Sequence, residues 1–290
     1  LSRGLVEACL GFINSIPKGE GLRACFYEFT YQPIILALKD AVTRGVDVKI
    51  AFHGTPANRK AITKAGLPKT HLGKPVLFER TVPKIPHNKF MIRLQGGKPE
   101  SVWTGSTNIT PSGFLGQTNV GHKIKDDGVA RSYLNYWEEI HKDPQTPDAR
   151  AASTKISPHP AELVAKKSMT TVFSPRHTDK MLDWYANRMS DATDLIMFTA
   201  AFNVSEQFLQ PLAKQRDFQR YILMEKRPSK ELKAALRADT DVMISYGAVL
   251  GETTIYKDKK PKKIRIQKFG LDKWLEKEEH FRETGNIFYV

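Results

Sequence analysis

Apolar residues recur with two different periods in the first half of the chain. Apolar stripes at helical spacing predict helices at residues 2–16, 32–44, 57–65 and 128–141. Short apolar or alternating runs predict strands at residues 22–29, 46–52, 76–79, 90–92, 101–104 and 119–124. The strand, helix, strand order favours right-handed parallel crossovers. We therefore expect an α/β fold in which helices flank a mixed sheet.

The second half shows a similar order of elements. Its pattern predicts a helix, a strand, a helix and a strand at residues 181–189, 195–200, 205–214 and 220–224. An offset of 172 residues pairs Ile196 with Ala24, Ala213 with Ala41, and Ile222 with Ile50. A further helix is expected at residues 273–280. These matches predict two related repeats.

A segment poor in apolar residues and rich in proline separates the two halves. We therefore assign residues 1–145 to a first repeat, residues 146–165 to a linker, and residues 166–290 to a second repeat.

Polar residues that can carry chemistry lie around a predicted hairpin. His87 and Lys89 alternate with Asn88 and precede an apolar run, so both side chains would project from one face of a strand. A turn signal at residues 96–99 precedes the returning strand, which leads to Ser106 and Asn108. Pairing of the two strands would bring these four polar groups to one site.

The combination of His-x-Lys and Gly-Ser-x-Asn resembles the phospholipase D superfamily. His87, Lys89, Gly105, Ser106 and Asn108 match that pattern. Leu94 occupies the position where the family usually has Asp. The resemblance implies a metal-independent phosphodiesterase without a cofactor, built from two related repeats that pack about a pseudo-twofold axis.

The resemblance also implies roles for these residues. His87 would be the nucleophile that forms a phosphohistidine, or the general acid, and the sequence leaves both roles open. Lys89 and Asn108 would bind phosphate oxygens, and Ser106 would orient the site or contact phosphate. A second His-x-Lys would come from an identical subunit or from residues beyond Val290, where the repeat places its second copy.

Further polar residues are weaker candidates. Gln117, Asn119 and His122 follow the Gly-Ser-x-Asn segment and are either supporting site residues or ordinary loop and strand-edge residues. Glu28 and His53 lie at the ends of neighbouring predicted strands, where a structural or solvent-exposed role is favoured over a role in the site.

Charge favours a polyanionic partner. The chain has 45 Lys and Arg against 31 Asp and Glu, a net charge of +14. Part of this charge is concentrated in Lys257, Lys259, Lys260, Lys262 and Lys263. This cluster is interpreted either as a solvated loop, which is favoured, or as a polyanion contact.

Several classes of protein are disfavoured by the sequence. No apolar run approaches the length of a membrane span, and no secretory signal begins the chain. No metal-ligand spacing is found among the eight His, and Cys9 and Cys25 are expected to be buried thiols of a cytoplasmic protein.

Three functions remain. Cleavage of DNA or RNA is favoured because of the basic charge. Hydrolysis or transfer on phospholipid, with an anionic lipid as partner, is the alternative. The third is a degenerate module that binds phosphate or serves assembly without cleaving.

Overall fold

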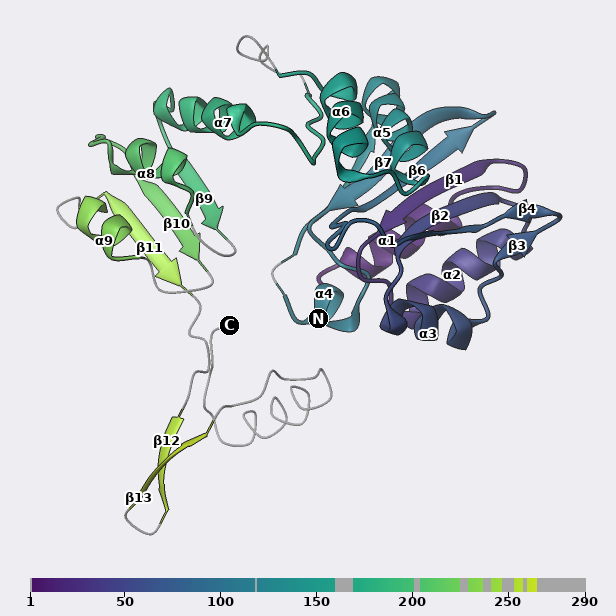
Figure 1. The fold of residues 1–290 in the computed structure, drawn as a ribbon, viewed down its shortest axis with the longest axis horizontal. Helices are drawn as coiled ribbons and strands as arrows, with labels where there is room; N and C mark the ends of the chain where they lie inside the picture. Colours follow the sequence, from purple (N-terminus) through teal and green to yellow (C-terminus); the bar gives the residue numbers. More distant parts are fainter. Residues whose placement is uncertain are drawn as a thin grey trace. The chain divides into compact units, whose positions relative to one another are not determined.

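The protein divides into two compact units, of which the first ends at His177 and the second begins at Thr178 (Figure 1). The structure, a computed structural model, describes residues 2–117, 119–159, 169–200, 204–224, 229–236, 241–246, 253–257 and 260–264.

A six-stranded mixed sheet forms the centre of the first unit. In spatial order its strands are β5 (Leu77–Arg80), β2 (Asp47–His53), β1 (Gly21–Phe26), β6 (Lys89–Gln95), β7 (Lys98–Gly105) and β8 (Gly121–Lys125). β1, β2 and β5 are parallel, whereas β6, β7 and β8 pair antiparallel. A small hairpin of β3 (Thr70–His71) and β4 (Lys74–Pro75) stands apart from this sheet. The mixed sheet predicted from the sequence is confirmed.

Helices cover both faces of this sheet (Figure 1). One hydrophobic core includes residues from α1 (Leu5–Asn14), α2 (Gln32–Thr43), α3 (Pro56–Ala65) and the short α4 (Pro111–Leu115). A second core, on the other face, is built around α5 (Asp127–Ile140). Neighbouring residues of β1 divide between the cores, with Ala24 in the first and Cys25 in the second, as the period of a strand requires.

The hairpin of β6 and β7 turns at Gly96 and Gly97. Their φ angles are +56° and +76°. A two-residue hairpin turn with two positive φ angles suits the twist of antiparallel strands, and glycine adopts it without a steric penalty. The predicted turn is therefore present, and the strands extend up to it on both sides.

The segment expected as a linker, residues 146–165, begins instead with a helix. α6 (Thr146–Ile156) packs against α5 and buries Ala149 and Ser153. Proline in this segment is compatible with a helix because a Pro lies in its first turn, where a backbone N–H has no intrahelical partner. Both cysteines are free and buried, as predicted.

The second unit contains a three-stranded parallel sheet in the order β11-β10-β9. Its elements are α7 (Lys180–Ser190), β9 (Ile196–Ala200), α8 (Glu206–Ala213), β10 (Arg220–Met224), α9 (Lys230–Leu236) and β11 (Val242–Tyr246). The sheet has the same order and direction as β5-β2-β1 of the first unit. The predicted helix at residues 273–280 lies outside the described residues.

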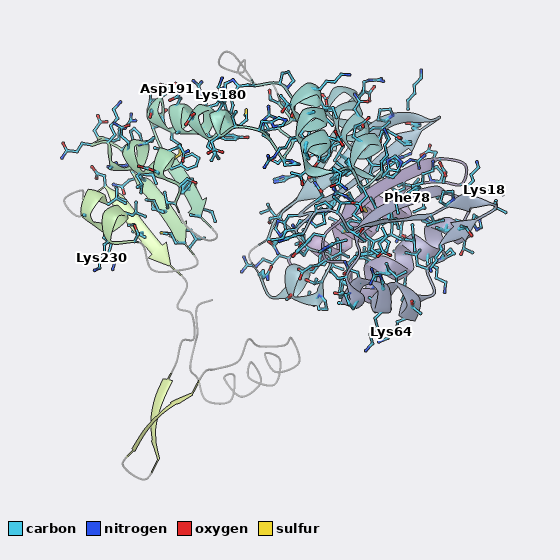
Figure 2. The ribbon with its side chains drawn as sticks, in the orientation of Figure 1. Lys18, Lys64, Phe78, Lys180, Asp191 and Lys230 are labelled. Atoms are coloured by element: carbon cyan, nitrogen blue, oxygen red, sulfur yellow. The ribbon has the colours of Figure 1, made fainter. Side chains whose placement is uncertain are left out.

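The basic cluster falls on a separate antiparallel hairpin rather than on a loop. β12 (Thr253–Lys257) pairs with β13 (Lys260–Ile264), so Lys257, Lys260, Lys262 and Lys263 belong to paired strands. Lys259 lies outside the described residues. Lys18 and Lys64 project from the first unit into solvent (Figure 2). Within the part of the chain that the structure describes, no helix is long and apolar enough to cross a bilayer.

Candidate active site

The His-x-Lys segment lies at the edge of the sheet where the parallel strands end. β6 runs antiparallel to β1 with Lys89 opposite Phe26, and Tyr27 N donates to Asn88 O at 2.9 Å. On the other side of β6, Phe90 lies opposite Thr104. The ends of β6 and β7 that carry Lys89 and the Gly-Ser-x-Asn segment are therefore side by side, as the sequence predicted.

Lys89 is buried in spite of its charge, with an exposed fraction of 9%. Its Nζ donates to His87 O at 3.0 Å and lies 5.5 Å from the centre of the Tyr27 ring. Burial lowers the pKa of Lys89 to about 8, and the nearby Glu28 carboxylate opposes this shift. Lys89 keeps two further N–H donors that can bind a ligand oxygen.

His87 is exposed and packs against one aromatic ring. Its imidazole meets Tyr27 edge-on, with 4.8 Å between ring centres. Partial burial lowers the pKa of His87 below its usual 6.5, the charge of Lys89 lowers it further, and Glu28 raises it. The neutral imidazole, which is the nucleophilic form, therefore predominates at neutral pH.

Tyr27 contacts the candidate site residues but was not predicted from the sequence. The ring of His53 stacks on it at 5.3 Å, so Tyr27 lies between two imidazoles. Burial is also the main reason why the pKa of His53 is lowered. Tyr27 follows β1 and His53 ends β2, and the carboxyl ends of adjacent parallel strands meet at one edge of a sheet. That rule is the signal by which Tyr27 could have been found.

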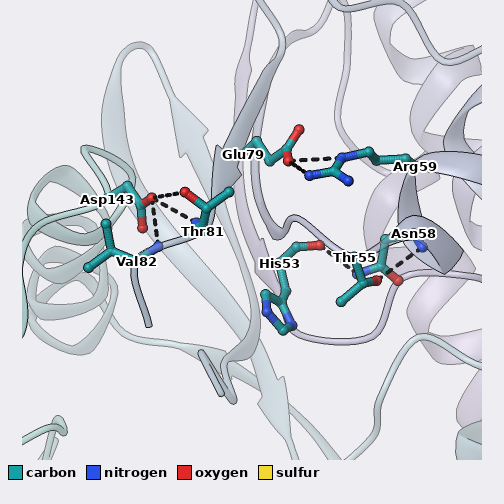
Figure 3. A network of polar contacts seen from close by, with 8 residues as sticks. All are labelled: His53, Thr55, Asn58, Arg59, Glu79, Thr81, Val82 and Asp143. Carbon is teal, nitrogen blue, oxygen red and sulfur yellow. Dashed lines mark hydrogen bonds and ion pairs between the residues drawn. The ribbon is translucent and has the colours of Figure 1, made fainter. Parts of the chain in front are cut away.

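Asn58 holds the aromatic pair in place. Its side chain is 2% exposed, and its Nδ2 donates to Tyr27 O at 2.8 Å and to His53 O at 2.9 Å. Its Oδ1 accepts from Phe29 N at 2.8 Å. Figure 3 shows Asn58 beside Thr55, whose hydroxyl caps the helix α3. One buried amide therefore links the ends of β1 and β2.

Asn88 anchors the motif to the opposite face of the sheet. Its Oδ1 accepts from Arg80 Nη1 at 3.0 Å, and its Nδ2 donates to Tyr136 Oη at 3.2 Å. Arg80 and Tyr136 are both buried. The predicted alternation therefore places the side chain of Asn88 on the opposite face from those of His87 and Lys89. Asn88 has a structural role, whereas His87 and Lys89 are the candidate site residues.

The loop before His87 is fixed by a carboxylate. Asp143 Oδ2 accepts from Thr81 N at 2.7 Å and Val82 N at 3.1 Å (Figure 3). The same carboxylate forms an ion pair with buried Arg80 at 4.0 Å. These contacts hold the connection between β5 and the His-x-Lys segment.

Ser106 has both of its hydrogen-bonding functions occupied. Its Oγ donates to Asn119 Oδ1 at 2.9 Å and accepts from Val120 N at 3.1 Å. Asn119 in turn donates to Gln117 Oε1 and Gly113 O, both at 2.9 Å. Ser106 therefore ties the Gly-Ser-x-Asn segment to the chain that leads into β8.

Steric crowding explains why residue 105 is glycine. A Cβ atom at this position would lie 2.1 Å from Val120 O, so any larger residue would separate the two segments.

Asn108 contacts Glu28, which was only a weak candidate on sequence grounds. Its Nδ2 donates to Glu28 Oε2, and its Oδ1 is buried with no hydrogen-bond partner among the described residues. Glu28 also influences the charges of His87 and Lys89. The structure thus gives Glu28 a place beside three of the predicted site residues.

Other candidates lie apart from these contacts. His122 is exposed on β8 opposite Thr104, and no hydrogen bond from it to Ser106 or Asn119 is found in the described part of the chain. Leu94 is buried near the far end of β6, opposite Gly21. Five residues of strand, about 17 Å, separate it from Lys89. Leu94 therefore packs the core and does not touch the site. The described residues contain no group of three or more His, Cys, Asp or Glu that could hold a metal ion.

Comparison with known proteins identifies the domain that carries this site. A family model described as "Cardiolipin synthase, PLD-like domain" matches residues 13–141. The comparison with curated proteins found no match.

Solved structures similar to the chain include three bacterial proteins. Nuc from Salmonella typhimurium, a phospholipase D family member, is 29% identical over 47% of this chain and 84% of its own, with a TM-score of 0.38. NucT from Helicobacter pylori is 19% identical over 49% of this chain and 90% of its own, with a TM-score of 0.39. Polyphosphate kinase from Porphyromonas gingivalis is 10% identical over 85% of this chain but 39% of its own, with a TM-score of 0.51. Residues 13–141 therefore match a domain of the phospholipase D superfamily.

Proposed function

We propose that this chain is a metal-independent phosphodiesterase that cleaves DNA or RNA. The observation that carries the proposal is the convergence of His87, Lys89 and Asn108 at one edge of the sheet, within a phospholipase D-like domain. An imidazole, an ammonium and an amide are the groups required to attack phosphorus and to bind its oxygens.

His87 acts as the nucleophile in this proposal. Its neutral imidazole attacks phosphorus, a P–N bond forms, and the P–O bond to the leaving alcohol breaks. A general acid protonates the leaving oxygen. The conjugate base of that acid then takes a proton from water as the water attacks phosphorus, the P–N bond breaks, and the phosphate product leaves. The lowered pKa of His87 suits the attacking role better than the acid role.

Lys89 and Asn108 bind the phosphate oxygens, where they stabilise the negative charge that develops in the transition state. Ser106 acts as an orienting residue, because its hydroxyl proton is already donated to Asn119. Gln117 supports this contact through Asn119. Tyr27 positions both His87 and Lys89 through ring contacts.

The general acid comes from a second His-x-Lys, either on a second copy of the chain or in a second repeat. The second unit supports the repeat, because α7-β9-α8-β10-α9-β11 follows the order of α1-β1-α2-β2-α3-β5. In this proposal the two related repeats pack about a pseudo-twofold axis.

Nucleic acid is the favoured substrate because the net charge of +14 attracts a polyanion. The Lys257–Lys263 hairpin is a proposed contact for its backbone. The description of the matched family model favours a second candidate, which is hydrolysis or transfer on a phospholipid.

Incubation with single-stranded DNA, duplex DNA, RNA and labelled phosphatidylcholine in EDTA tests these proposals. Cleavage of a nucleic acid by the wild type but not by His87→Ala supports the first candidate, and release of a headgroup supports the second. Phosphate binding without cleavage of any substrate would indicate a degenerate binding or assembly module. Activity that EDTA abolishes would contradict the metal-independent mechanism.

A further inference from the structure

A carboxylate beside a phosphate-binding site requires an explanation, because it repels the ligand. Glu28 is such a carboxylate: it accepts a hydrogen bond from Asn108 Nδ2, one of the amide donors proposed to bind phosphate oxygen. The side chain is exposed. Core packing therefore does not account for a charged residue at this position.

The backbone fixes Glu28 beside Asn108. Ile109 N donates to Glu28 O at 3.1 Å, and Phe29 forms a parallel bridge with Ile109. Thr30 N also donates to Ile109 O, at 2.8 Å. The chain that leaves β1 and the chain that follows Asn108 are thus joined by two backbone hydrogen bonds, which keep the backbone of Glu28 beside Asn108.

Glu28 also lies close enough to the two catalytic candidates to change their charge equilibria. It raises the pKa of His87 and that of Lys89, in both cases against the lowering effect of burial. At neutral pH the half-site therefore combines the positive Lys89, the neutral His87 and the negative Glu28. Each negative charge on a ligand is repelled by Glu28, so this carboxylate opposes the binding of a dianion twice as strongly as that of a monoanion.

We propose that Glu28 is a specificity-determining residue, whose carboxylate favours phosphate groups with one negative charge over those with two. Phosphodiesters carry one charge, and phosphomonoesters carry two above their second pKa of about 6. The residue would thus direct the site towards internal diester bonds and away from terminal phosphates. This inference rests on the proposed function of the same site.

The size of the effect follows from Coulomb's law. The repulsion between Glu28 and a ligand is proportional to the ligand charge, so removing the carboxylate changes the binding free energy of a dianion by twice that of a monoanion. The fold-change for the dianion is therefore the square of that for the monoanion. If Glu28→Gln tightens diester binding about threefold, it tightens monoester binding about tenfold. Glutamine retains an oxygen that can accept from Asn108.

Titrations with diethyl phosphate and ethyl phosphate, followed by phosphorus NMR in EDTA at about pH 7.5, test this inference on the whole chain. The preference is the ratio of the diester affinity to the monoester affinity, and Glu28→Gln should lower this ratio about threefold relative to the wild type. Glu28→Asp, which keeps the charge, should retain the preference. Glu20→Gln is the control for loss of a carboxylate at the other end of β1, where Glu20 pairs with Arg93, and it should leave the preference unchanged.

Either of two results would contradict the inference about Glu28 and leave the proposed function standing. Either Glu28→Gln changes the affinity for both ligands by the same factor, or Glu20→Gln reduces the preference as much as Glu28→Gln does. Lys89→Met distinguishes failure of the proposed function, since it should weaken the binding of both ligands. If Lys89→Met binds both as the wild type does, or if the wild type binds neither, then the site does not bind phosphate and both proposals are wrong.

Discussion

Asn88 lies between His87 and Lys89, but its side chain serves the opposite face of the sheet. It links Arg80, whose exposed fraction is 4%, to the buried hydroxyl of Tyr136. Tyr136 Oη donates onward to Ser174 O at 2.6 Å. Replacement of Asn88 by Ala should therefore destabilise the first unit without removing any group proposed to contact substrate.

The magnitude follows from the two hydrogen bonds that are lost. A hydrogen bond from a charged donor such as Arg80 contributes about 1.5 to 3 kcal/mol, and the bond to the neutral Tyr136 hydroxyl about 0.5 to 1.5 kcal/mol. We therefore expect Asn88→Ala to lower the opening free energy around β6 by about 2 to 4 kcal/mol. The turnover rate should fall by about tenfold to a hundredfold, because loss of this anchor lets His87 and Lys89 shift.

Amide hydrogen exchange of β1 and β6 measures the local stability, and cleavage assays on folded protein measure the rate. Asn135→Ala is the control, because Asn135 is exposed on α5 and its replacement should change stability by less than about 0.5 kcal/mol. The double variant Asn88→Ala, Tyr136→Phe should lose less opening free energy than the sum of the losses in the two single variants, because both remove the same hydrogen bond. If Asn88→Ala leaves both exchange and turnover at wild-type values, the anchoring role is wrong.

Two further predictions concern pH and the core. Cleavage should be fastest near neutral pH: acid protonates His87, whose pKa is lowered from 6.5, and base neutralises Lys89, whose pKa is about 8. A pH–rate profile should show both losses, and a rate that still rises above about pH 9 would contradict these assignments. Leu94→Ala should lower the unfolding free energy by about 2 to 5 kcal/mol, because Leu94 is 5% exposed. The cleavage rate per folded molecule should stay the same, and a specific loss of rate would show that Leu94 serves the site after all.

The periodicity of the sequence was sufficient to predict most of the fold. β10 spans residues 220–224 as expected, and α2 and α5 lie within one or two residues of their predicted bounds. The helix α6 was missed because prolines and few apolar residues suggested a linker. Its burial depends on packing against the preceding helix α5, and such a contact cannot be inferred from the apolar pattern of α6 alone.

The part of the candidate site that lies on one hairpin could be predicted from the sequence. Lys89 begins β6 and His87 lies two residues before it, and the hairpin brings the Gly-Ser-x-Asn segment beside Lys89. Tyr27 and Asn58 were not predicted, because their roles come from ring stacking and from a buried amide that joins separate strands. Glu28 was ranked low because an exposed Glu at a strand end is ordinary. Only its bond to Asn108 distinguishes it.

A trapping experiment tests the central proposal most directly. The protein is mixed with an oligonucleotide that carries labelled phosphate at its internal diester bonds, in EDTA and with enzyme in excess, and is quenched in alkali, where phosphohistidine is stable. We expect label on the peptide that contains His87 in the wild type and none in His87→Ala. Cleavage of the oligonucleotide with no label on that peptide, or with undiminished turnover in His87→Ala, would contradict it.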